Sequence, residues 1–299
     1  MLLNLIGAGR LGRTLARAWR DAGCCEIGAV LCRDAAHARA AVGFIGAGQP
    51  MTGLTGLPTA GLWLIATPDN AIAQVAGALA QAGGPCAADL VFHASGVLDA
   101  GVLAPLARQG ATCGSLHPAL SFAEPQRALG DLPGTAWAVE GDPAALPRLE
   151  ALALALGGLP FRLAPGGKAA YHAATVVASN YLVTLNVLAQ QLAVQAGLDA
   201  GTAAAVLGPL MRRTLDNVLA LGPAAALTGP IARGDGATVA RHLAVIDDMR
   251  LDAAYRTLGL ATLPLTALPA ESREALAGLL KLNTEATENT EARREHPQA

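Results

Sequence analysis

The chain has 299 residues, of which 53% are hydrophobic and 15% are charged, and its formal net charge is −2. This composition excludes a disordered chain and allows a sizeable hydrophobic core. Without a basic surplus, and with an aromatic content of only 3%, the chain is not expected to bind nucleic acid or an anionic membrane surface.

The cysteine pattern indicates a reducing compartment. None of the cysteines belongs to a C-x-x-C pair and no histidine lies at zinc-finger spacing, so we expect no metal site. The N-terminus lacks the basic and apolar regions of a signal peptide. Scattered cysteines in odd number are typical of cytoplasmic proteins, which is where we expect this one. The cysteines are Cys24, Cys25, Cys32, Cys86 and Cys113.

The first half of the chain alternates short apolar runs with alanine-rich helical segments. This alternation predicts an α/β fold with a Rossmann-type, doubly wound parallel sheet. Helices are expected at 11–22 and 70–82, and a helix at 149–156 closes this half. The expected strands are Leu2–Ile6, Ile27–Leu31, Gly61–Ala66, Leu90–His93, Thr112–Ser115 and Thr135–Val139.

A glycine-rich motif connects the first expected strand to the first expected helix. It reads Gly7-Ala8-Gly9-Arg10-Leu11-Gly12. In this pattern the first glycine permits a tight turn, the second lets the backbone approach a pyrophosphate, and the third allows helix and strand to pack closely. The helix N-terminus adds N–H donors and a favourable dipole. The context favours dinucleotide binding over a strand–turn–helix without a ligand.

The end of the second expected strand indicates NADP(H) rather than NAD(H). NAD sites usually place a carboxylate about 20 residues after the glycine motif, where it binds the ribose 2′-hydroxyl. Here Cys32 stands at that position and is followed by Arg33 and Asp34. The planar guanidinium of Arg33 suits a 2′-phosphate. In the alternative, Arg33 is a solvated loop residue and Asp34 only caps the next helix.

Polar residues also follow the third expected strand, at the edge where open α/β sheets bind ligands. Thr67 and Pro68 are expected to face the cofactor ribose. Asp69 is expected either to contact the cofactor or to cap the helix that follows.

Two later clusters, His93–Gly96 and Ser115–Phe122, follow apolar strands at the same edge. An imidazole there can exchange a proton with a carbonyl or an alcohol near neutral pH. Ser95 and His117 are therefore candidate catalytic residues. The alternative for His117 is a structural hydrogen bond within its loop.

The β/α alternation stops at the segment 163–167, which reads Leu-Ala-Pro-Gly-Gly. We expect a Rossmann domain at 1–164 and a helical substrate and dimerisation domain at 165–282. Residues 283–299 are rich in Glu, Thr and Asn and predict a disordered tail. Helices are expected near 168–196, 200–220, 235–249, 251–259 and 270–282, and Gly-Pro pairs are expected to interrupt or kink them.

Lys168 opens the first of these helices and shares a face with His172, four residues later. A lysine at a domain junction can protonate a developing alkoxide or bind a carboxylate. The alternative is a solvated lysine, although the helix dipole disfavours a cation in the first turn. His172, together with Asn180 on a neighbouring face, is a candidate substrate contact.

The same helix carries no formally charged side chain between Lys168 and Asp199. Its length would allow it to cross a bilayer. Its many amide and hydroxyl side chains would be costly in lipid, so we expect no membrane span. We expect instead that other helices or a second subunit enclose it, and therefore a homodimer.

The segment 227–235 is expected to be an irregular loop between helices. Its Arg233 is a candidate contact to substrate or to the other subunit, and Asp235 is a candidate N-cap for the next helix.

Together these motifs resemble the family in which an N-terminal Rossmann-like domain precedes a helical domain of unknown function 2520. More distantly, the layout resembles 6-phosphogluconate dehydrogenase-like reductases, which include ketopantoate reductases, pyrroline-5-carboxylate reductases and prephenate dehydrogenases. The resemblance covers residues 1 to about 280. It is carried by Gly7–Gly12, Thr67–Ile72, Ser115–Phe122, Lys168–Leu182 and Leu227–Leu243.

Two relatives suggest different catalytic residues. Ser95 and His117-Pro118 look like the serine and His-Pro motif of prephenate dehydrogenases, although Ser121 replaces the closing glycine of that motif. Lys168 looks like the interdomain lysine of hydroxyacid dehydrogenases and ketopantoate reductases, whose partner asparagine is His172 here.

The resemblance and the motifs imply an NADP(H)-dependent oxidoreductase that reduces a small, carboxylate-bearing carbonyl compound. Lys168 or His117 would protonate the oxygen, while Asn180 and Arg233 would orient the substrate. The alternatives are an imine reductase or an alcohol dehydrogenase of the same superfamily, or a non-catalytic NADP(H)-binding module that senses redox state.

Overall fold

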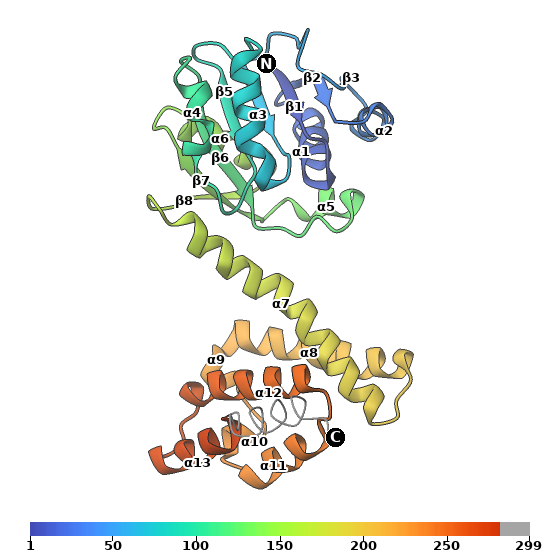
Figure 1. Ribbon diagram of the computed structural model, residues 1–299, viewed down its shortest axis with the longest axis vertical. Coiled ribbons are helices and arrows are strands. Elements are labelled where there is room, and N and C mark those ends of the chain that lie inside the picture. Colours follow the sequence, from blue (N-terminus) through green and yellow to red (C-terminus); the bar gives the residue numbers. More distant parts are fainter. Residues whose placement is uncertain (282–299) are drawn as a thin grey trace, which may run out of the picture. The chain divides into compact units, whose positions relative to one another are not determined.

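The computed structural model describes residues 1–281, which form two compact units (Figure 1). The first unit is Met1–Tyr181 and the second begins at Leu182. The tail expected at 283–299 lies outside the described residues. Helix α7 (Lys168–Gln195) contributes its first turns to the first unit and its remainder to the second.

An eight-stranded sheet forms the centre of the first unit, in the order β3-β2-β1-β4-β5-β6-β7-β8. Each neighbouring pair is parallel except β6 and β7. The carboxyl ends of β1, β2, β4, β5 and β6 consequently meet at one edge. The strands are β1 (Leu2–Ile6), β2 (Glu26–Leu31), β3 (Gln49–Met51), β4 (Leu62–Ile65), β5 (Leu90–His93), β6 (Thr112–Pro118), β7 (Ala136–Gly141) and β8 (Leu159–Arg162).

Helices cover both faces of the sheet, which confirms the doubly wound architecture (Figure 1). On one face the core is formed with α1 (Arg10–Asp21), α2 (Ala35–Ile45) and α6 (Leu146–Leu154). On the other face it is formed with α3 (Asp69–Gln81), the 3₁₀ turn η1 (Ala100–Leu103) and α4 (Ala104–Ala107). The short helix α5 (Pro125–Asp131) packs beside α1.

Strands β3 and β8, at the two edges of the sheet, were not expected from the sequence. Each contains a proline, Pro50 in β3 and Pro160 in β8, and most of their residues are exposed. Proline is tolerated on edge strands because it has no N–H to donate to a second neighbour. Short strands without an apolar repeat give no period-2 signal, which is why they were missed.

The second unit is helical, as expected. The segment 227–235 is not simply an irregular loop, because Gly229-Pro230 begins a short helix there: Gly229 supplies a positive φ and Pro230 a favourable first helical position. Asp235 caps the following helix through the Thr238 N–H, at 3.0 Å, as expected. The helices after α7 are α8 (Ala200–Leu221), α9 (Pro223–Ala226), α10 (Pro230–Arg233), α11 (Gly236–Val245), α12 (Met249–Thr262), the 3₁₀ turn η2 (Leu263–Leu265) and α13 (Ala270–Leu280).

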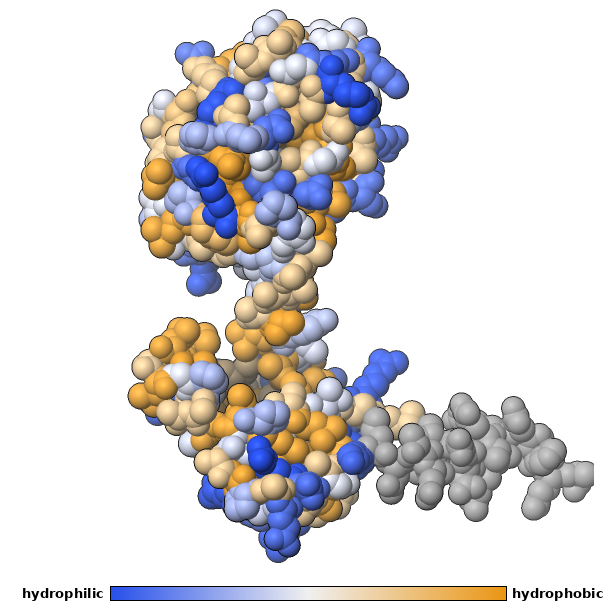
Figure 2. Space-filling view, turned by 90° about the vertical axis from the view of Figure 1, so that its left-hand side faces the viewer, coloured by the Kyte–Doolittle hydropathy of each residue, from blue (hydrophilic) through white to orange (hydrophobic). Residues whose placement is uncertain are grey.

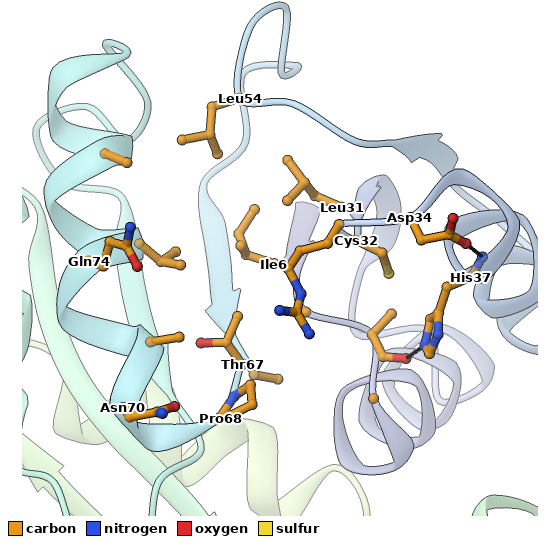
Figure 3. Close-up of a pocket in the computed structure, with 18 residues that line it drawn as sticks. Ile6, Leu31, Cys32, Asp34, His37, Leu54, Thr67, Pro68, Asn70 and Gln74 are labelled. Atoms are coloured by element: carbon orange, nitrogen blue, oxygen red, sulfur yellow. Dashed lines mark hydrogen bonds between the residues drawn. The ribbon is translucent and has the colours of Figure 1, made fainter.

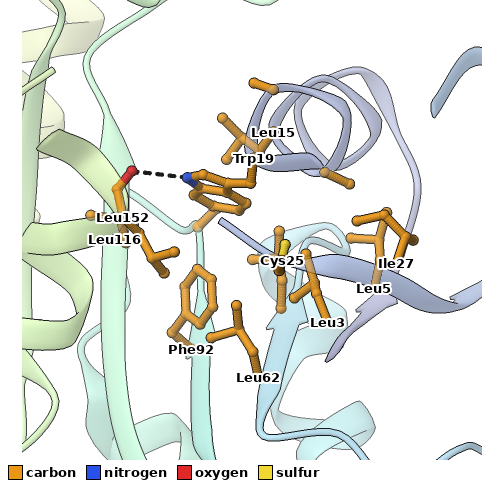
Figure 4. Packing of buried hydrophobic residues seen from close by; sticks show 14 of the residues in the cluster. Leu3, Leu5, Leu15, Trp19, Cys25, Ile27, Leu62, Phe92, Leu116 and Leu152 are labelled. Carbon is orange, nitrogen blue, oxygen red and sulfur yellow. Dashed lines mark hydrogen bonds between the residues drawn. The ribbon is translucent and has the colours of Figure 1, made fainter. Parts of the chain in front are cut away.

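Two buried tryptophans stand in different polar environments in the core of the first unit. Trp19 of α1 packs edge-on against Phe92 and donates its indole N–H to the carbonyl of Leu152 at 2.9 Å (Figure 4). The indole N–H of Trp137 in β7 is buried and has no hydrogen-bond partner among residues 1–281. The Trp19 ring therefore connects α1 to α6 by a hydrogen bond, whereas the Trp137 ring makes none to the described residues.

We predict that Trp19→Phe destabilises the protein more than Trp137→Phe does. Both changes remove similar apolar area, but only the first leaves a buried carbonyl without its donor, which costs roughly 1–3 kcal/mol. Urea unfolding followed by circular dichroism measures the difference. Equal losses of stability in the two variants would contradict the importance of the Trp19–Leu152 bond.

Candidate functional site

A pocket of about 690 Å³ lies at the carboxyl ends of β1, β2 and β4 (Figure 3). The glycine turn after β1, the loop after β2 and the start of α3 form its walls. It is lined by residues that include Gly7, Gly9, Arg33, His37, Thr67 and Asn70.

The glycine turn is shaped to receive a negatively charged group. Gly7 has φ +89, and a Cβ there would lie 2.8 Å from the backbone nitrogen of Thr67. A Cβ at Gly9 would meet no atom within 4 Å. Gly9 also precedes α1 without a side-chain cap, and the first turn of α1 has no acidic residue. The first N–H groups of α1, from Arg10 to Gly12, therefore have no partner within the helix and favour an anion at this end.

The remaining residues predicted to bind the cofactor differ in where they lie. Arg33 is exposed and lines the pocket. Asp34 also lines it, and its carboxylate caps α2 by accepting from the His37 N–H at 2.8 Å. The hydroxyl of Thr67 is buried and unpartnered within the described residues, so it offers a hydrogen bond to a ligand. Asp69 begins α3 and is not among the residues that line the pocket.

A second group of polar side chains lies at the ends of the next two strands, β5 and β6. Its centre is Lys168, in the first turn of α7, whose side chain is 3% exposed. The Lys168 Nζ donates to the carbonyl oxygen of Ser95 and to Oγ of Ser115, both at 2.6 Å. The lysine thereby connects the start of α7 to the loop after β5 and to β6 itself.

The imidazole of His117 packs beside this lysine and contacts the next residues of α7. Its Nδ1 lies 3.0 Å from the hydroxyl of Tyr171, and its ring stands edge-on to that of His172. A Cβ at Gly96 would lie 2.9 Å from Nε2 of His117 and would also collide with the His172 ring. The glycine is needed because both rings pack directly on its backbone.

The loop that carries Ser95 is held by His93, which is fully buried. The Ser95 N–H donates to Nδ1 of His93 at 3.2 Å, and Nε2 of His93 lies 3.1 Å from the carbonyl of Asp99. Since Nδ1 accepts, the proton is on Nε2 and is donated to Asp99. The Ser95 hydroxyl accepts from the N–H groups of Val97 and Leu98.

Burial controls the protonation of this cluster. It lowers the pKa of Lys168 to about 8, although Glu140, Asp69 and Asp99 act in the opposite direction. Burial, assisted by the charge of Lys168, lowers the pKa of His117 to about 4. At neutral pH the site therefore contains one ammonium group beside a neutral imidazole.

The first unit thus brings together Ser95, His117, Lys168 and His172, four residues that the sequence singled out. Asn180 lies further along α7 and is exposed. Arg233 ends α10 in the second unit, where it is exposed. The pKa of the nearby Asp235 is lowered mainly by hydrogen bonds from Thr238, and the charge of Arg233 acts in the same direction. None of the described residues forms a cluster of three or more side chains suited to a metal ion.

Two members of the cluster were not among the predicted site residues. Tyr171 follows Lys168 by three residues, so helical spacing places it on the same face. Ser115 precedes His117 by two residues, so strand spacing places both on the same side of β6. These spacings can be read from the sequence, but nothing in the sequence distinguishes Ser115 from Ser95 or Ser121.

Two protein families match the two parts of the chain. Residues 1–118 match the Rossmann-like domain family, and residues 135–262 match the family described as domain of unknown function 2520. A protein of Thermotoga maritima has 27% identity and a TM-score of 0.67, with 91% of this chain and 98% of that chain covered. No curated protein matches the sequence.

Two further structures share the fold at lower identity. A proposed NADP oxidoreductase from Bacteroides fragilis has 23% identity and a TM-score of 0.72, covering 88% of this chain and 98% of its own. A reductive aminase from Aspergillus terreus, in complex with NADPH and ethyl-5-oxohexanoate, has 17% identity and a TM-score of 0.53, covering 96% and 93%.

We predict that Gly96→Ala forces the two histidine rings out of position. Such overpacking typically costs roughly 1–3 kcal/mol, and the imidazole resonances of His117 and His172 should shift in NMR spectra. Gly77→Ala is the matched control, because a Cβ at this position in α3 meets no atom within 4 Å. Because alanine favours the helix more than glycine does, Gly77→Ala should be neutral or stabilising. If Gly96→Ala unfolds at the same urea concentration as the parent, the packing on Gly96 is not as described.

Proposed function

We propose that this chain, which combines a Rossmann-like domain with a domain of unknown function 2520, is an NADP(H)-dependent oxidoreductase. Its substrate would be a small carbonyl compound that bears a carboxylate, as in ketopantoate reductases. The observation that carries the proposal is the position of the buried Lys168 cluster directly beside the glycine-lined pocket, at the ends of neighbouring strands of one sheet.

The pocket has the features that an NADP(H) site requires. The unpaired N–H groups at the start of α1 would bind the pyrophosphate, Arg33 the 2′-phosphate, and the buried Thr67 hydroxyl together with Pro68 the second ribose. The proteins from Bacteroides fragilis and Aspergillus terreus, which share this fold, support the choice of nucleotide. When bound, NADPH would supply the hydride.

The order of the strands sets the direction in which a bound nucleotide would lie along the sheet edge. Arg33 follows β2, the glycine turn follows β1, Thr67 follows β4, Ser95 follows β5, and His117 is part of β6. Since these strands are neighbours in the order β2-β1-β4-β5-β6, a nucleotide whose 2′-phosphate is bound by Arg33 would extend toward the Lys168 cluster.

We predict that NADPH binds more tightly than NADH and that Arg33→Ala removes most of the difference. Charge-assisted hydrogen bonds of this kind contribute roughly 1.5–3 kcal/mol, or about tenfold to a hundredfold in affinity. Isothermal titration with both nucleotides measures it. Arg39→Ala is the matched control, because Arg39 is also an exposed arginine but does not line the pocket. Equal affinities in the parent protein would refute the assignment.

Lys168 has the properties of a proton donor for this reaction. With a pKa of about 8 it is mostly protonated at neutral pH, yet it releases a proton more readily than an ordinary lysine. Its charge would also stabilise a developing alkoxide and disfavour a cationic iminium, which favours a carbonyl over an imine substrate. His117 is neutral at the same pH and would position Tyr171 and the substrate. His172, Asn180 and Arg233 remain the proposed substrate contacts.

We predict that Lys168→Ala lowers kcat by about 10²–10⁴-fold and that His117→Ala costs less. In the parent enzyme, reduction should weaken as pH rises through about 8, because the ammonium form is lost, and alcohol oxidation should strengthen over the same range. Steady-state kinetics on a panel of keto acids, imines and alcohols measures both effects.

The outcomes of that panel separate the candidate functions. Turnover of imines but not of keto acids would identify an imine reductase, and turnover of alcohols alone a dehydrogenase. NADPH binding without any turnover would favour the redox-sensing module. A normal kcat for Lys168→Ala with an inactive His117→Ala would exchange the two roles.

We further propose that the protein is a homodimer that buries apolar surface of its second unit. Between residues 1 and 281, α7 is the helix long and apolar enough to cross a membrane, but its amide and hydroxyl side chains favour a protein partner. In α7 and α8, Val183 is 66% exposed and Leu219 is 77% exposed. Figure 2 shows apolar surface over this unit. A face of this kind is typical of a subunit interface.

We predict a mass of about twice 30.1 kDa by light scattering at micromolar concentration. Leu219→Glu should shift the protein toward the monomer, because it places a charge in the apolar face. Leu154→Glu, at a similarly exposed leucine of α6 in the first unit, should leave the mass unchanged. A parent protein that is monomeric under these conditions would refute the proposal.

A further inference from the structure

The ammonium of Lys168 is buried without forming a salt bridge. Among the described residues, no carboxylate oxygen lies within 4.0 Å of its Nζ. A buried charge must be compensated by hydrogen bonds, because its transfer from water is unfavourable. For Lys168 the described compensation consists of two neutral oxygen atoms, the backbone carbonyl of Ser95 and the hydroxyl of Ser115.

Several charged or titratable groups surround this lysine from the neighbouring elements. Asp69 at the start of α3, Asp99 before η1 and Glu140 of β7 favour its charged form. His93 of β5 and His117 of β6 also lie within electrostatic range of it and are themselves kept neutral by burial. These groups act at a distance, whereas Ser95 and Ser115 touch the ammonium.

Ser115 differs from Ser95 in the chemistry of its contact. It is fully buried in β6, and its hydroxyl accepts from Lys168 at 2.6 Å while lying 3.4 Å from the Ser95 carbonyl, to which it can donate. The Ser95 contact uses the backbone and persists with any side chain. Ser115 therefore supplies the side-chain acceptor for this ammonium in the described part of the chain.

We infer that Ser115 is a positioning residue that fixes the Lys168 ammonium between β6 and the loop after β5 and sets its proton affinity. Its hydroxyl oxygen stabilises the charged form of the lysine, since a neutral amine needs no such acceptor. Without it the buried ammonium keeps a single short hydrogen bond to the described residues. The neutral amine is then favoured, and the lysine releases its proton at lower pH.

The consequence for catalysis rests on the proposed function. If Lys168 is the proton donor, Ser115 determines the pH above which reduction fails. The effect on the lysine itself does not depend on that role, so it can be measured without nucleotide or substrate.

The composition of the chain makes this measurement direct. Lys168 and Lys281 are its only lysines. In the Lys281→Arg background, protein labelled with ¹³C-lysine has a single lysine Cε resonance, whose chemical shift reports the protonation of Lys168. We expect a titration midpoint near 8 in this background. Ser115→Ala should lower the midpoint by about one pH unit, a tenfold change in the ratio of amine to ammonium.

Two kinds of control complete the experiment. Ser121→Ala removes an exposed serine from the loop after β6 and should leave the midpoint unchanged. Ser115→Thr and Ser115→Val have the same shape but differ in the hydroxyl, so the valine variant should titrate at the lower pH. This pair decides the question if Ser115→Ala does not fold. Midpoints that agree within about 0.3 units between Thr and Val, or between Ala and the parent, would overturn the inference.

The activity readout separates this inference from the proposed function. If the keto-acid panel is turned over, the alkaline limb of kcat/KM should move with the NMR midpoint in Ser115→Ala. A shifted midpoint in a protein that reduces no substrate would support the role of Ser115 and contradict the proposed reaction. An unshifted midpoint in an active reductase would contradict the role of Ser115 and support the proposed reaction.

Discussion

The buried ammonium of Lys168 is the interaction on which the candidate active site depends. By donating to the Ser95 carbonyl and the Ser115 hydroxyl, it holds the first turn of α7 against β6 and the loop after β5. Helical spacing then places Tyr171 and His172 on the same face, where they meet His117. A lysine that was free in solvent would leave the position of these rings unspecified.

The same interaction explains why the cluster is chemically unusual. Burying a cation lowers its pKa, and burial together with the neighbouring Lys168 charge makes His117 harder to protonate. In water the pKa values of lysine and histidine differ by about four units. In this site both pKa values are lowered, and that of Lys168 remains the higher of the two. The lysine therefore remains the group that carries a proton at neutral pH, and the histidine the group that does not.

The sequence predicted the parts of this architecture that depend on local pattern. Buried strands such as β4 and β5 form apolar runs, the glycine motif needs a tight turn, and Lys168 and His172 share a helical face at four-residue spacing. It did not predict β3 and β8, whose prolines and exposed residues have no strand period, or the antiparallel pairing of β6 with β7. Ser115 was missed as a site residue because its importance arises from Lys168, which lies 53 positions away in the chain.

The pocket and the Lys168 cluster lie along the same edge of the sheet but depend on different physical features. This difference decides how much of the function a sequence motif can indicate. At β1 and β2, recognition uses backbone N–H groups, a positive φ and the absence of a Cβ, so the glycines themselves specify an anion-binding turn. At β5 and β6, the chemistry depends on burial, and burial is a property of the folded arrangement. The same serine, histidine and lysine would act differently in solvent. A glycine motif can therefore indicate a dinucleotide, whereas the identity of the substrate depends on contacts that only the packed cluster defines.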